Sequence, residues 1–266
     1  MRKGISFVIL TWNSKQYIRN CLDSVLDLAG FALEIIVIDN GSVDGTPQII
    51  RQEYPEVVLI ELYKNYGTTY TRNLGLKKAN PEHQYICILD SDTIINQNAT
   101  ENLIACLEAH PSYMIAVPRM HNISKEYQLS VKKFPTVSIK VLKAIPLKVF
   151  NQLGRKMESY DFNMGKDIYE IDYGISACWM MKREILERVG YLDEKIFYAP
   201  EDVDYCVRVW ENGGKVLLAT KSVIVHDTQR ISKKKFFSKI NFSHLAGLLY
   251  YFKKHRYIFS ARKIRN

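Results

Sequence analysis

Short apolar runs alternate with helical patterns through the first half of the chain, and this alternation constrains the fold more than any other feature. The apolar runs have the length and composition of buried strands, and the stretches between them carry apolar residues at helical spacing. The expected strands are 5–10, 34–39, 57–62, 85–89 and 114–117, and the expected helices include 15–28, 68–79 and 98–109. Strands that alternate with helices form right-handed crossovers, so the sequence predicts an α/β fold with a mostly parallel central sheet flanked by helices.

The second half of the chain is less regular. Residues 120–172 contain Pro135 and Pro146 and show no steady period, so we interpret them as a substrate loop or lid. Regular patterns then return, with a strand expected at 174–182, helices at 184–189 and 201–212, and short strands at 215–218 and 223–225. The Gly213-Gly214 pair marks the end of the longer helix.

Charge is distributed unevenly along the 266 residues, whose formal net charge is +9. Residues 221–266 hold twelve Lys or Arg and one acid, which leaves a net charge of −2 on the rest of the chain. A basic segment interleaved with aromatic residues can lie on an anionic membrane surface, bind nucleic acid, or simply pack on the body as a solvated helix. We favour the membrane surface and regard nucleic acid as the least expected partner. The expected division is a body at 1–228 and a basic amphipathic helical extension at 229–266.

Composition excludes several classes of protein. With 47% hydrophobic and 24% charged residues, the chain can bury a full core. The five cysteines are an odd number and form no C-x-x-C pair, which argues against a disulfide scaffold or a structural zinc site and suits a reducing compartment such as the cytoplasm. We find no segment with the roughly 18 to 20 apolar residues that a membrane span needs.

Polar side chains follow three of the expected strands at the point where each strand ends. Thr11, Trp12 and Asn13 follow the first strand, Asp39 closes the second, and the 90–92 segment Asp-Ser-Asp closes the fourth. Ligands bind beyond the carboxyl ends of the strands in parallel sheets, so these residues are candidates for a site. A carboxylate at position 39 could accept hydrogen bonds from a nucleobase or ribose. Two carboxylates one residue apart suit a hard divalent cation such as Mg²⁺ or Mn²⁺, although a turn and a helix cap favour the same residue type.

Three further features lie outside these strand ends. Arg72 lies in a segment with small residues, where it could meet an anionic or nucleotide group. The helix expected at 201–212 begins with three acids, Glu201, Asp202 and Asp204. Acids in a first turn interact favourably with the helix dipole, but three acids in four residues exceed what capping requires. One of them could be a general base. His226 ends a short strand and matters if the fold brings it to the Asp-Ser-Asp motif. The dinucleotide fingerprint G-x-G-x-x-G does not follow the first strand, which disfavours an NAD-dependent oxidoreductase.

Taken in order, these motifs resemble those of the family 2 inverting glycosyltransferases with the GT-A fold, whose central sheet is Rossmann-like. The similarity extends from about residue 5 to residue 226 and is weakest at 120–172. It is carried by the motifs SFVILTWN, VIDNGSVDGT, NYGTTYTRNLG, LDSD, GISACWMMK and VIVH. The pair GYLDEKIF and APEDVDYCVRVWENG is most similar to a rhamnosyltransferase-like bacterial branch that builds cell-surface polysaccharide.

This resemblance implies a role for each candidate residue. The nucleotide would be bound by Thr11, Trp12, Asn13, Asp39, Arg72 and Asp90. The metal would be held by Asp92 as the more direct ligand, with Asp90 and, as in some members of the family, His226. Asp202 would be the catalytic base, with Glu201 beside it to position the acceptor, and the segment 174–177 would lie near the acceptor.

The function implied by the resemblance is transfer of a hexosyl or deoxyhexosyl group, with inversion and with Mn²⁺ or Mg²⁺, from a UDP- or dTDP-linked donor to a glycan or lipid-linked acceptor. The enzyme would be cytoplasmic and peripheral at the inner face of the membrane, with a nucleotide-sugar half at about 1–118 and an acceptor half at about 119–228. Two alternatives are a catalytically silent nucleotide-sugar or polyanion-binding module and a nucleotidyltransferase. The intact set of Asp90, Asp92 and Asp202 argues against the first, and the second leaves the Glu201-Asp202 helix unexplained.

Overall fold

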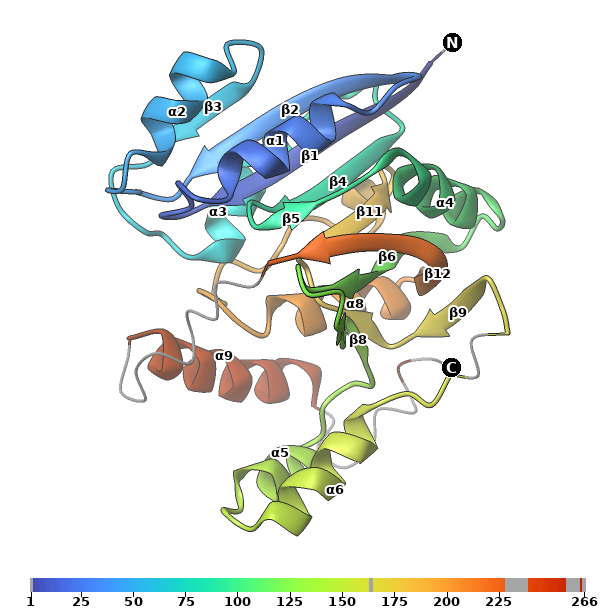
Figure 1. Cartoon of the computed structure of the whole chain (residues 1–266). Helices are drawn as coiled ribbons and strands as arrows, with labels where there is room; N and C mark the ends of the chain where they lie inside the picture. Colours follow the sequence, from blue (N-terminus) through green and yellow to red (C-terminus); the bar gives the residue numbers. More distant parts are fainter. Residues whose placement is uncertain (1, 163–164, 228–238, 257–263, 265–266) are drawn as a thin grey trace.

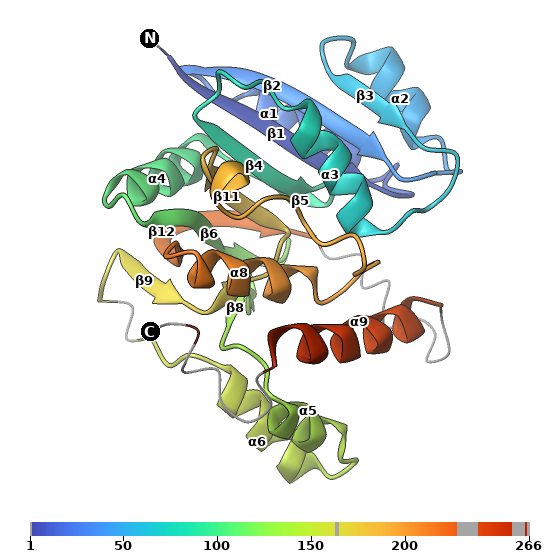
Figure 2. The ribbon, with the colours of Figure 1, turned by 180° about the vertical axis from the view of Figure 1, so that it is seen from behind.

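A twisted sheet runs through the centre of the computed structural model, which describes residues 2–162, 165–227, 239–256 and 264 (Figure 1). One half of the sheet is parallel, with the strand order β3-β2-β1-β4. These strands are β1 (Lys3–Thr11), β2 (Phe31–Asp39), β3 (Val58–Glu61) and β4 (Tyr85–Asp90). Helix α1 (Ile18–Leu26) covers one face of this half and α3 (Thr68–Lys78) the other, while α2 (Thr46–Glu53) follows β2 (Figures 1 and 2).

Burial on both faces explains the continuous apolar runs of these strands. Ile5, Phe7, Val8 and Ile9 of β1 have no exposed surface. A strand with one wet face would alternate apolar and polar residues, whereas a strand covered by helices on both sides is apolar throughout. The predicted α/β fold with a mostly parallel central sheet flanked by helices is therefore confirmed.

The second half of the sheet adds antiparallel pairs. The order continues from β4 through β11, β6 and β12 to β5; β6 and β12 are parallel, whereas β11 is antiparallel to both its neighbours. The bounds are β5 (Thr93–Ile94), β6 (Tyr113–His121), β11 (Cys178–Lys182) and β12 (Lys215–His226). Helix α4 (Gln97–Glu108) lies on one face of this half and α8 (Glu201–Glu211) on the other, and the short α7 is Ile185–Arg188 (Figures 1 and 2).

Residues 120–172, which we expected to form a loop or lid, contain regular structure instead. Two antiparallel helices, α5 (Val137–Ala144) and α6 (Lys148–Glu158), form a hairpin that projects from the lower end of the molecule in Figure 1. Short strands flank the hairpin: β7 (Tyr127–Gln128), β8 (Val131–Lys132), β9 (Ile168–Ile171) and β10 (Tyr173–Gly174). Pro135 precedes the first helix and Pro146 separates the two, so both prolines lie between elements, where their missing N–H groups cost nothing.

At two places the expected strands are divided differently from the observed ones. The strand expected at 174–182 is broken into β10 and β11, with residues 175–177 between them. The two strands expected at 215–218 and 223–225 are one strand, β12, whose pairing with β6 shifts register between Ala219 and Val223. The irregularity bends a single strand, and the sequence pattern of this strand is therefore similar to that of two separate strands.

Helix α9 (Lys239–His255) forms the described part of the basic extension and packs on the body. Tyr251 is fully buried and Leu248 packs against the core, as the packing interpretation of this segment predicts. A side-chain carbon added at Gly247 would lie 2.2 Å from the carbonyl oxygen of Ala199, so the helix approaches the chain closely just before α8. The 229–238 part of the extension, with its Lys233–Lys235 run and Phe236, lies outside the described residues. Among the described residues, the structure has no helix long and apolar enough to cross a membrane.

Candidate active site

Strand register brings the predicted donor-site residues to one edge of the sheet. Thr11 pairs with Asp39 across β1 and β2, and Leu10 pairs with Asp90 across β1 and β4. Because the three strands are parallel neighbours, their carboxyl ends meet, and the segments that follow them meet as well. The half-buried Trp12 and Asn13 follow β1 directly at this edge.

Asp39 and the turn after it form a compact group of hydrogen-bonded polar residues. Asp39 Oδ2 accepts a hydrogen bond from the backbone N–H of Ser42 (2.8 Å), and Ser42 Oγ accepts one from the backbone N–H of Asn13 (2.8 Å). Asp39 Oδ1 and Thr11 Oγ1 are buried and have no hydrogen-bond partner among the described residues. Burial raises the pKa of the Asp39 carboxyl, and the hydrogen bonds from Ser42 oppose this shift. A buried oxygen without a donor is the arrangement expected where a ligand N–H or O–H completes the site.

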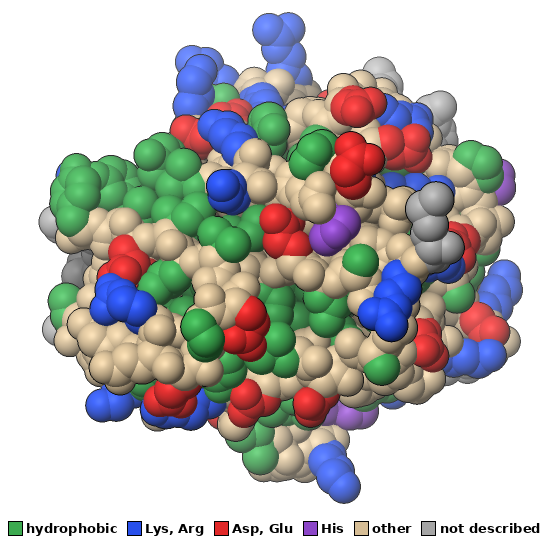
Figure 3. All heavy atoms as spheres, turned by 90° about the horizontal axis from the view of Figure 1, so that it is seen from above, with side chains coloured by type: hydrophobic (Ala, Val, Ile, Leu, Met, Phe, Trp, Pro, Cys, Tyr) green, Lys and Arg blue, Asp and Glu red, His purple; other side chains and the backbone are tan. Residues whose placement is uncertain are grey.

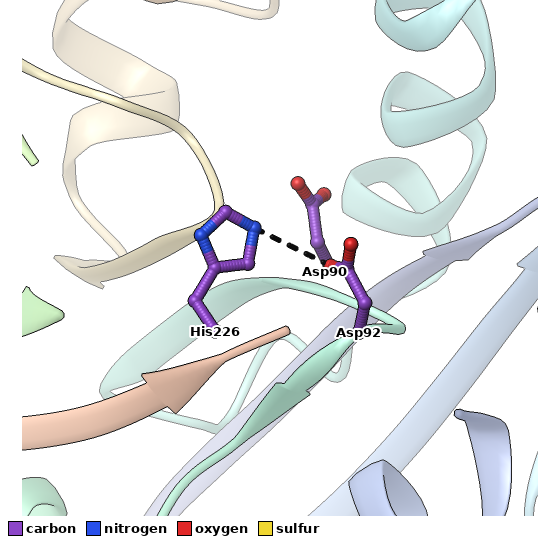
Figure 4. Close-up of side chains that lie close together, drawn as sticks. All are labelled: Asp90, Asp92 and His226. Carbon is purple, nitrogen blue, oxygen red and sulfur yellow. Dashed lines mark ion pairs between the residues drawn. The ribbon is translucent and has the colours of Figure 1, made fainter. Parts of the chain in front are cut away.

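Asp90, Asp92 and His226 converge although they come from different parts of the chain. Each offers one ligand atom, and these atoms all lie within 4.8 Å of one another (Figure 4). Asp92 Oδ1 lies 3.5 Å from His226 Nε2. Two carboxylates and an imidazole suit a divalent cation such as Mn²⁺, which accepts both oxygen and nitrogen ligands. The donor set therefore fits the predicted metal.

Gln128 holds the imidazole of His226 in place. Its Oε1 lies 3.0 Å from His226 Nδ1, and its Nε2 donates to the backbone carbonyl of His226 (2.8 Å). With Nδ1–H donating to Gln128, Nε2 faces Asp92 with its lone pair available; a hydrogen-bond partner on the other ring nitrogen is usual for metal-binding histidines. Burial lowers the pKa of His226, but the neighbouring carboxylates, Asp92 foremost among them, together outweigh burial, and the net shift is upward.

The middle residue of the Asp-Ser-Asp motif is directed into the protein. Ser91 is buried, and its hydroxyl donates to the hydroxyl of Ser14 (2.8 Å) after β1. An acidic residue at this position would bury a third carboxylate beside Asp90 and Asp92, so a small residue is what this packing requires. The serine, which differs from the acid that many members of the resembled family have there, is thus compatible with an intact pair of flanking carboxylates.

Arg72 joins the Asp90–Asp92–His226 cluster to the start of α8. The fully buried guanidinium donates to Asp90 Oδ1 (2.6 Å) through Nη2 and to Glu201 Oε1 (3.0 Å) through Nη1. It also donates to the hydroxyl (2.7 Å) and the carbonyl (3.2 Å) of Ser176. The planar guanidinium can serve several acceptors at fixed angles, which a lysine cannot do. The predicted proximity of Arg72 to the nucleotide is untested by these contacts, which show a link between two carboxylates.

Glu201 and Asp202 are neighbours with different surroundings. Glu201 Oε1 accepts hydrogen bonds from Arg72 and from Ser176 Oγ (3.0 Å), so this carboxylate is held on the Arg72 side. Asp202 is only half-buried, and among the described residues its carboxylate accepts one hydrogen bond, from the backbone N–H of Val203 (2.8 Å). Burial raises the pKa of both carboxyls. Asp202 is therefore the one whose oxygens can turn to an incoming hydroxyl.

Sequence reasoning missed two residues of this arrangement. Ser176 lies in the 174–177 segment assigned to the acceptor, but its role as a bridge between Arg72 and Glu201 had no signal in the sequence. Gln128 lies in the irregular 120–172 region, where nothing marked it out. Both are defined by partners at least 25 positions away in the chain.

An apolar rim lies beside the strand ends. Hydrophobic side chains gather at the left end of the face shown in Figure 3, which is the end where β1 and β2 finish in Figure 1. In the loops at this end, Val43 and Tyr63 are largely exposed, and Phe197 packs against the turn at Gly67. Tyr63, Tyr66 and Tyr70 form a chain of ring contacts with centroids 5.2 to 5.3 Å apart. The rim offers aromatic surface next to the polar residues.

Comparison with known proteins agrees with this geometry. The family model described as "Glycosyl transferase family 2" matches residues 6–190. The minor teichoic acid biosynthesis protein GgaA of Bacillus subtilis is 38% identical over 104 residues, and the poly-beta-1,6-N-acetyl-D-glucosamine synthase of Staphylococcus aureus is 32% identical over 126. These alignments cover 37% and 46% of this chain but only 23% and 30% of the relatives, so the chain matches less than a third of either one.

Solved structures with low sequence identity share the fold. Residues 1–349 of TarS from S. aureus, in complex with UDP-GlcNAc, superpose with a TM-score of 0.59 at 19% identity, covering 88% of this chain and 62% of that fragment. The mannosyltransferase PcManGT of Pyrobaculum calidifontis, in complex with GDP-Man and Mn²⁺, superposes with a TM-score of 0.63 at 19% identity, covering 96% and 65%. These two structural matches confirm the expected fold.

Proposed function

This chain belongs to glycosyl transferase family 2, and we propose that it is a metal-dependent inverting enzyme that transfers a hexosyl or deoxyhexosyl group from a nucleotide-diphosphate sugar to a hydroxyl of a glycan or lipid-linked acceptor. One observation carries the proposal. Arg72 bonds Asp90 of the carboxylate–histidine cluster and Glu201 beside Asp202, so a candidate diphosphate site and a candidate base lie on either side of one guanidinium.

The nucleotide would bind at the carboxyl ends of β1 and β2. Trp12 would pack on the base, and Thr11 and Asn13 would line the pocket. The unpartnered Oδ1 of Asp39 supports this assignment, because this oxygen has no hydrogen-bond donor among the residues that the structure describes and the imide N–H of uracil or thymine could supply one. UDP and dTDP are therefore the carriers we propose. TarS, which shares the fold, binds UDP and UDP-GlcNAc.

Asp92, Asp90 and His226 would hold the metal, with Asp92 as the most direct ligand. The bound Mn²⁺ or Mg²⁺ would supply compensation for the negative charge that develops on the departing diphosphate. Two observations support this assignment. The ligand atoms of the three residues all lie within 4.8 Å of one another, and Gln128 orients the imidazole. Arg72, paired with Asp90, would fix that carboxylate so that it does not turn away from the site.

Asp202 would act as the general base. The acceptor oxygen attacks the anomeric carbon as its proton passes to the Asp202 carboxylate, and the bond from that carbon to the diphosphate oxygen breaks with its electron pair leaving on the nucleotide. A single displacement from the opposite face inverts the anomeric carbon. Glu201, held by Arg72 and Ser176, would position the acceptor near the 174–177 segment rather than take the proton.

The relatives point to a cell-surface polymer as the acceptor. One is named for minor teichoic acid biosynthesis and the other for poly-beta-1,6-N-acetyl-D-glucosamine synthesis. A rhamnosyltransferase-like role in bacterial polysaccharide synthesis agrees with these names. We further propose a nucleotide-sugar half at about 1–118, an acceptor half at about 119–228, and a cytoplasmic enzyme held peripherally at the inner face of the membrane.

The test is product formation with defined stereochemistry. Purified enzyme is incubated with Mn²⁺, a panel of UDP- and dTDP-sugars, and undecaprenyl-linked or free glycan acceptors, and the anomeric configuration of the product is read by NMR. An inverted glycosidic product that requires Mn²⁺ supports the proposal. A retained configuration refutes the mechanism, a nucleotidyl product identifies a nucleotidyltransferase instead, and donor binding without any product across the panel favours a silent binding module.

A further inference from the structure

Helix α6 presents an apolar face to solvent. Val149, Phe150, Leu153 and Met157, together with Leu147 just before the helix, are between 40% and 73% exposed. At 100° per residue, the four helical positions fall within one arc of about 100°. Isolated exposed apolar residues are ordinary, but a continuous arc on one helix indicates an interaction surface.

The opposite face of α6 is firmly docked, so the apolar arc is not the result of a loose helix. A side-chain carbon added at Gly154 would lie 2.7 Å from the side chain of Lys143 and 3.2 Å from the carbonyl oxygen of Ile139, both on α5. The buried Glu158 accepts hydrogen bonds from Lys140 (3.4 Å) and Lys143 (2.5 Å) of α5. The hairpin therefore fixes which face of α6 is directed outward.

The charged residues around the apolar arc indicate which kind of surface it binds. Residues 127–157 contain seven basic residues and no acidic one. They are Lys132, Lys133, Lys140, Lys143, Lys148, Arg155 and Lys156. Two of these are paired with Glu158, whereas Lys148 and Lys156 are exposed and lie on the side of α6 that flanks the apolar arc. An apolar arc bordered by lysines is the pattern of a helix that lies in the interface of an anionic bilayer.

We propose that the α5–α6 hairpin is the membrane-docking element of this protein, with the apolar arc of α6 inserted at the level of the headgroups and the flanking lysines on lipid phosphates. This moves the membrane contact from the C-terminal extension, where the sequence placed it, to residues 137–158. Helix α9 packs its Tyr251 side into the body, and among the side chains of this helix that the structure describes, Leu245 and Leu249 are the large exposed apolar ones. The inference deepens the proposed peripheral location but does not depend on the chemistry at Asp202.

The test uses the full chain and vesicles of phosphatidylcholine, with or without 30% phosphatidylglycerol. Val149→Ser/Leu153→Ser removes the centre of the arc, and Gln152→Ser, an exposed position of the same helix, is the matched control. We expect the double variant to bind anionic vesicles at least ~10-fold more weakly than wild type, and the control to bind like wild type. Lys148→Gln/Lys156→Gln should weaken binding and flatten its salt dependence.

Three outcomes would contradict the proposal. Equal binding by wild type and the Val149→Ser/Leu153→Ser variant would place the contact elsewhere, and loss of binding only in Leu245→Ser/Leu249→Ser would return it to α9. If wild type ignores both vesicle types but dimerises by light scattering, and the double variant is monomeric, the arc is an interface between copies. Unchanged donor binding by the double variant verifies its fold and separates failure of this inference from failure of the proposed function.

Discussion

Asp92 Oδ1 lies 3.5 Å from His226 Nε2, although the two residues come from opposite ends of the catalytic region. The contact depends on β12, which pairs antiparallel with β5 so that His226 is opposite Thr93, next to Asp92. The last strand of the body therefore completes a site begun by the fourth. A short motif at residue 90 becomes a three-ligand cluster only through this pairing.

Gln128 should raise the metal affinity of this cluster by orienting His226, without being a ligand itself. Gln128→Leu removes the hydrogen bond to His226 Nδ1 and leaves the ring free to turn, and loss of such a partner typically costs 10- to 100-fold in metal affinity. We expect Mn²⁺ affinity, measured by calorimetry in the presence of UDP, to fall by roughly 10-fold. Gln52→Leu, at an exposed position of α2, is the matched control. Equal affinities in the two variants would refute the orienting role.

Asp202→Asn should separate chemistry from binding. The amide keeps the size of the side chain but cannot take a proton, so kcat should fall by about 10²- to 10⁴-fold while the Kd of the nucleotide-sugar stays near the wild-type value. Glu211→Gln, a partly exposed acid at the end of the same helix, controls for loss of charge on α8. Turnover by Asp202→Asn within about twofold of wild type would remove Asp202 from the base role.

The dependence of kcat on pH should reflect the titration of Asp202. Burial raises the pKa of Asp202, while the charge of Lys132 opposes this shift. A base works as the carboxylate, so kcat should fall as the pH is lowered through this raised pKa, above the range of an ordinary aspartate. Lys132→Gln removes the opposing charge and should move this acid limb to higher pH. Lys133→Gln is the neighbouring control, and identical limbs in the two variants would contradict the assignment.

Helix α9 should stabilise the segment that leads into α8. A side chain at Gly247 meets the carbonyl of Ala199, immediately before Pro200 and Glu201, whereas Ala246 is exposed. Gly247→Val should therefore destabilise the protein by about 1–3 kcal/mol and lower kcat, and Ala246→Val should do neither. Thermal unfolding by circular dichroism and steady-state kinetics measure the two effects. Equal melting temperatures would show that the helix is not seated there in solution.

The parallel half of the sheet could be predicted because strands that are buried on both faces have apolar residues along most of their length. The strands β1, β2 and β4 are continuous apolar runs, and Asp39 and Asp90 stand out because each ends such a run. The site edge follows from parallel order alone. The similarity of the motifs to a known family added roles to these positions, which periodicity could not supply.

The rest depends on contacts between distant segments. The α5–α6 hairpin had no clear period because its apolar residues are divided between the contact of the two helices with each other and a face in solvent. Gln128 lies on a strand of two residues, too short to leave a pattern. Arg72 lies between Asp90 and Glu201 because the start of α3 is hydrogen-bonded to residues 196–198, just before α8, and no local spacing encodes this contact.

The central claim is that the Asp90–Asp92–His226 cluster binds a nucleotide-sugar through a divalent metal. Calorimetric titration of UDP- and dTDP-sugars, with Mn²⁺ and with EDTA, into wild type and Asp92→Asn tests it most directly, with Asp167→Asn as an exposed control. We predict binding by wild type and the control only when Mn²⁺ is present, and little or none by Asp92→Asn. Binding that is equally tight in EDTA, or unchanged in Asp92→Asn, would contradict the account.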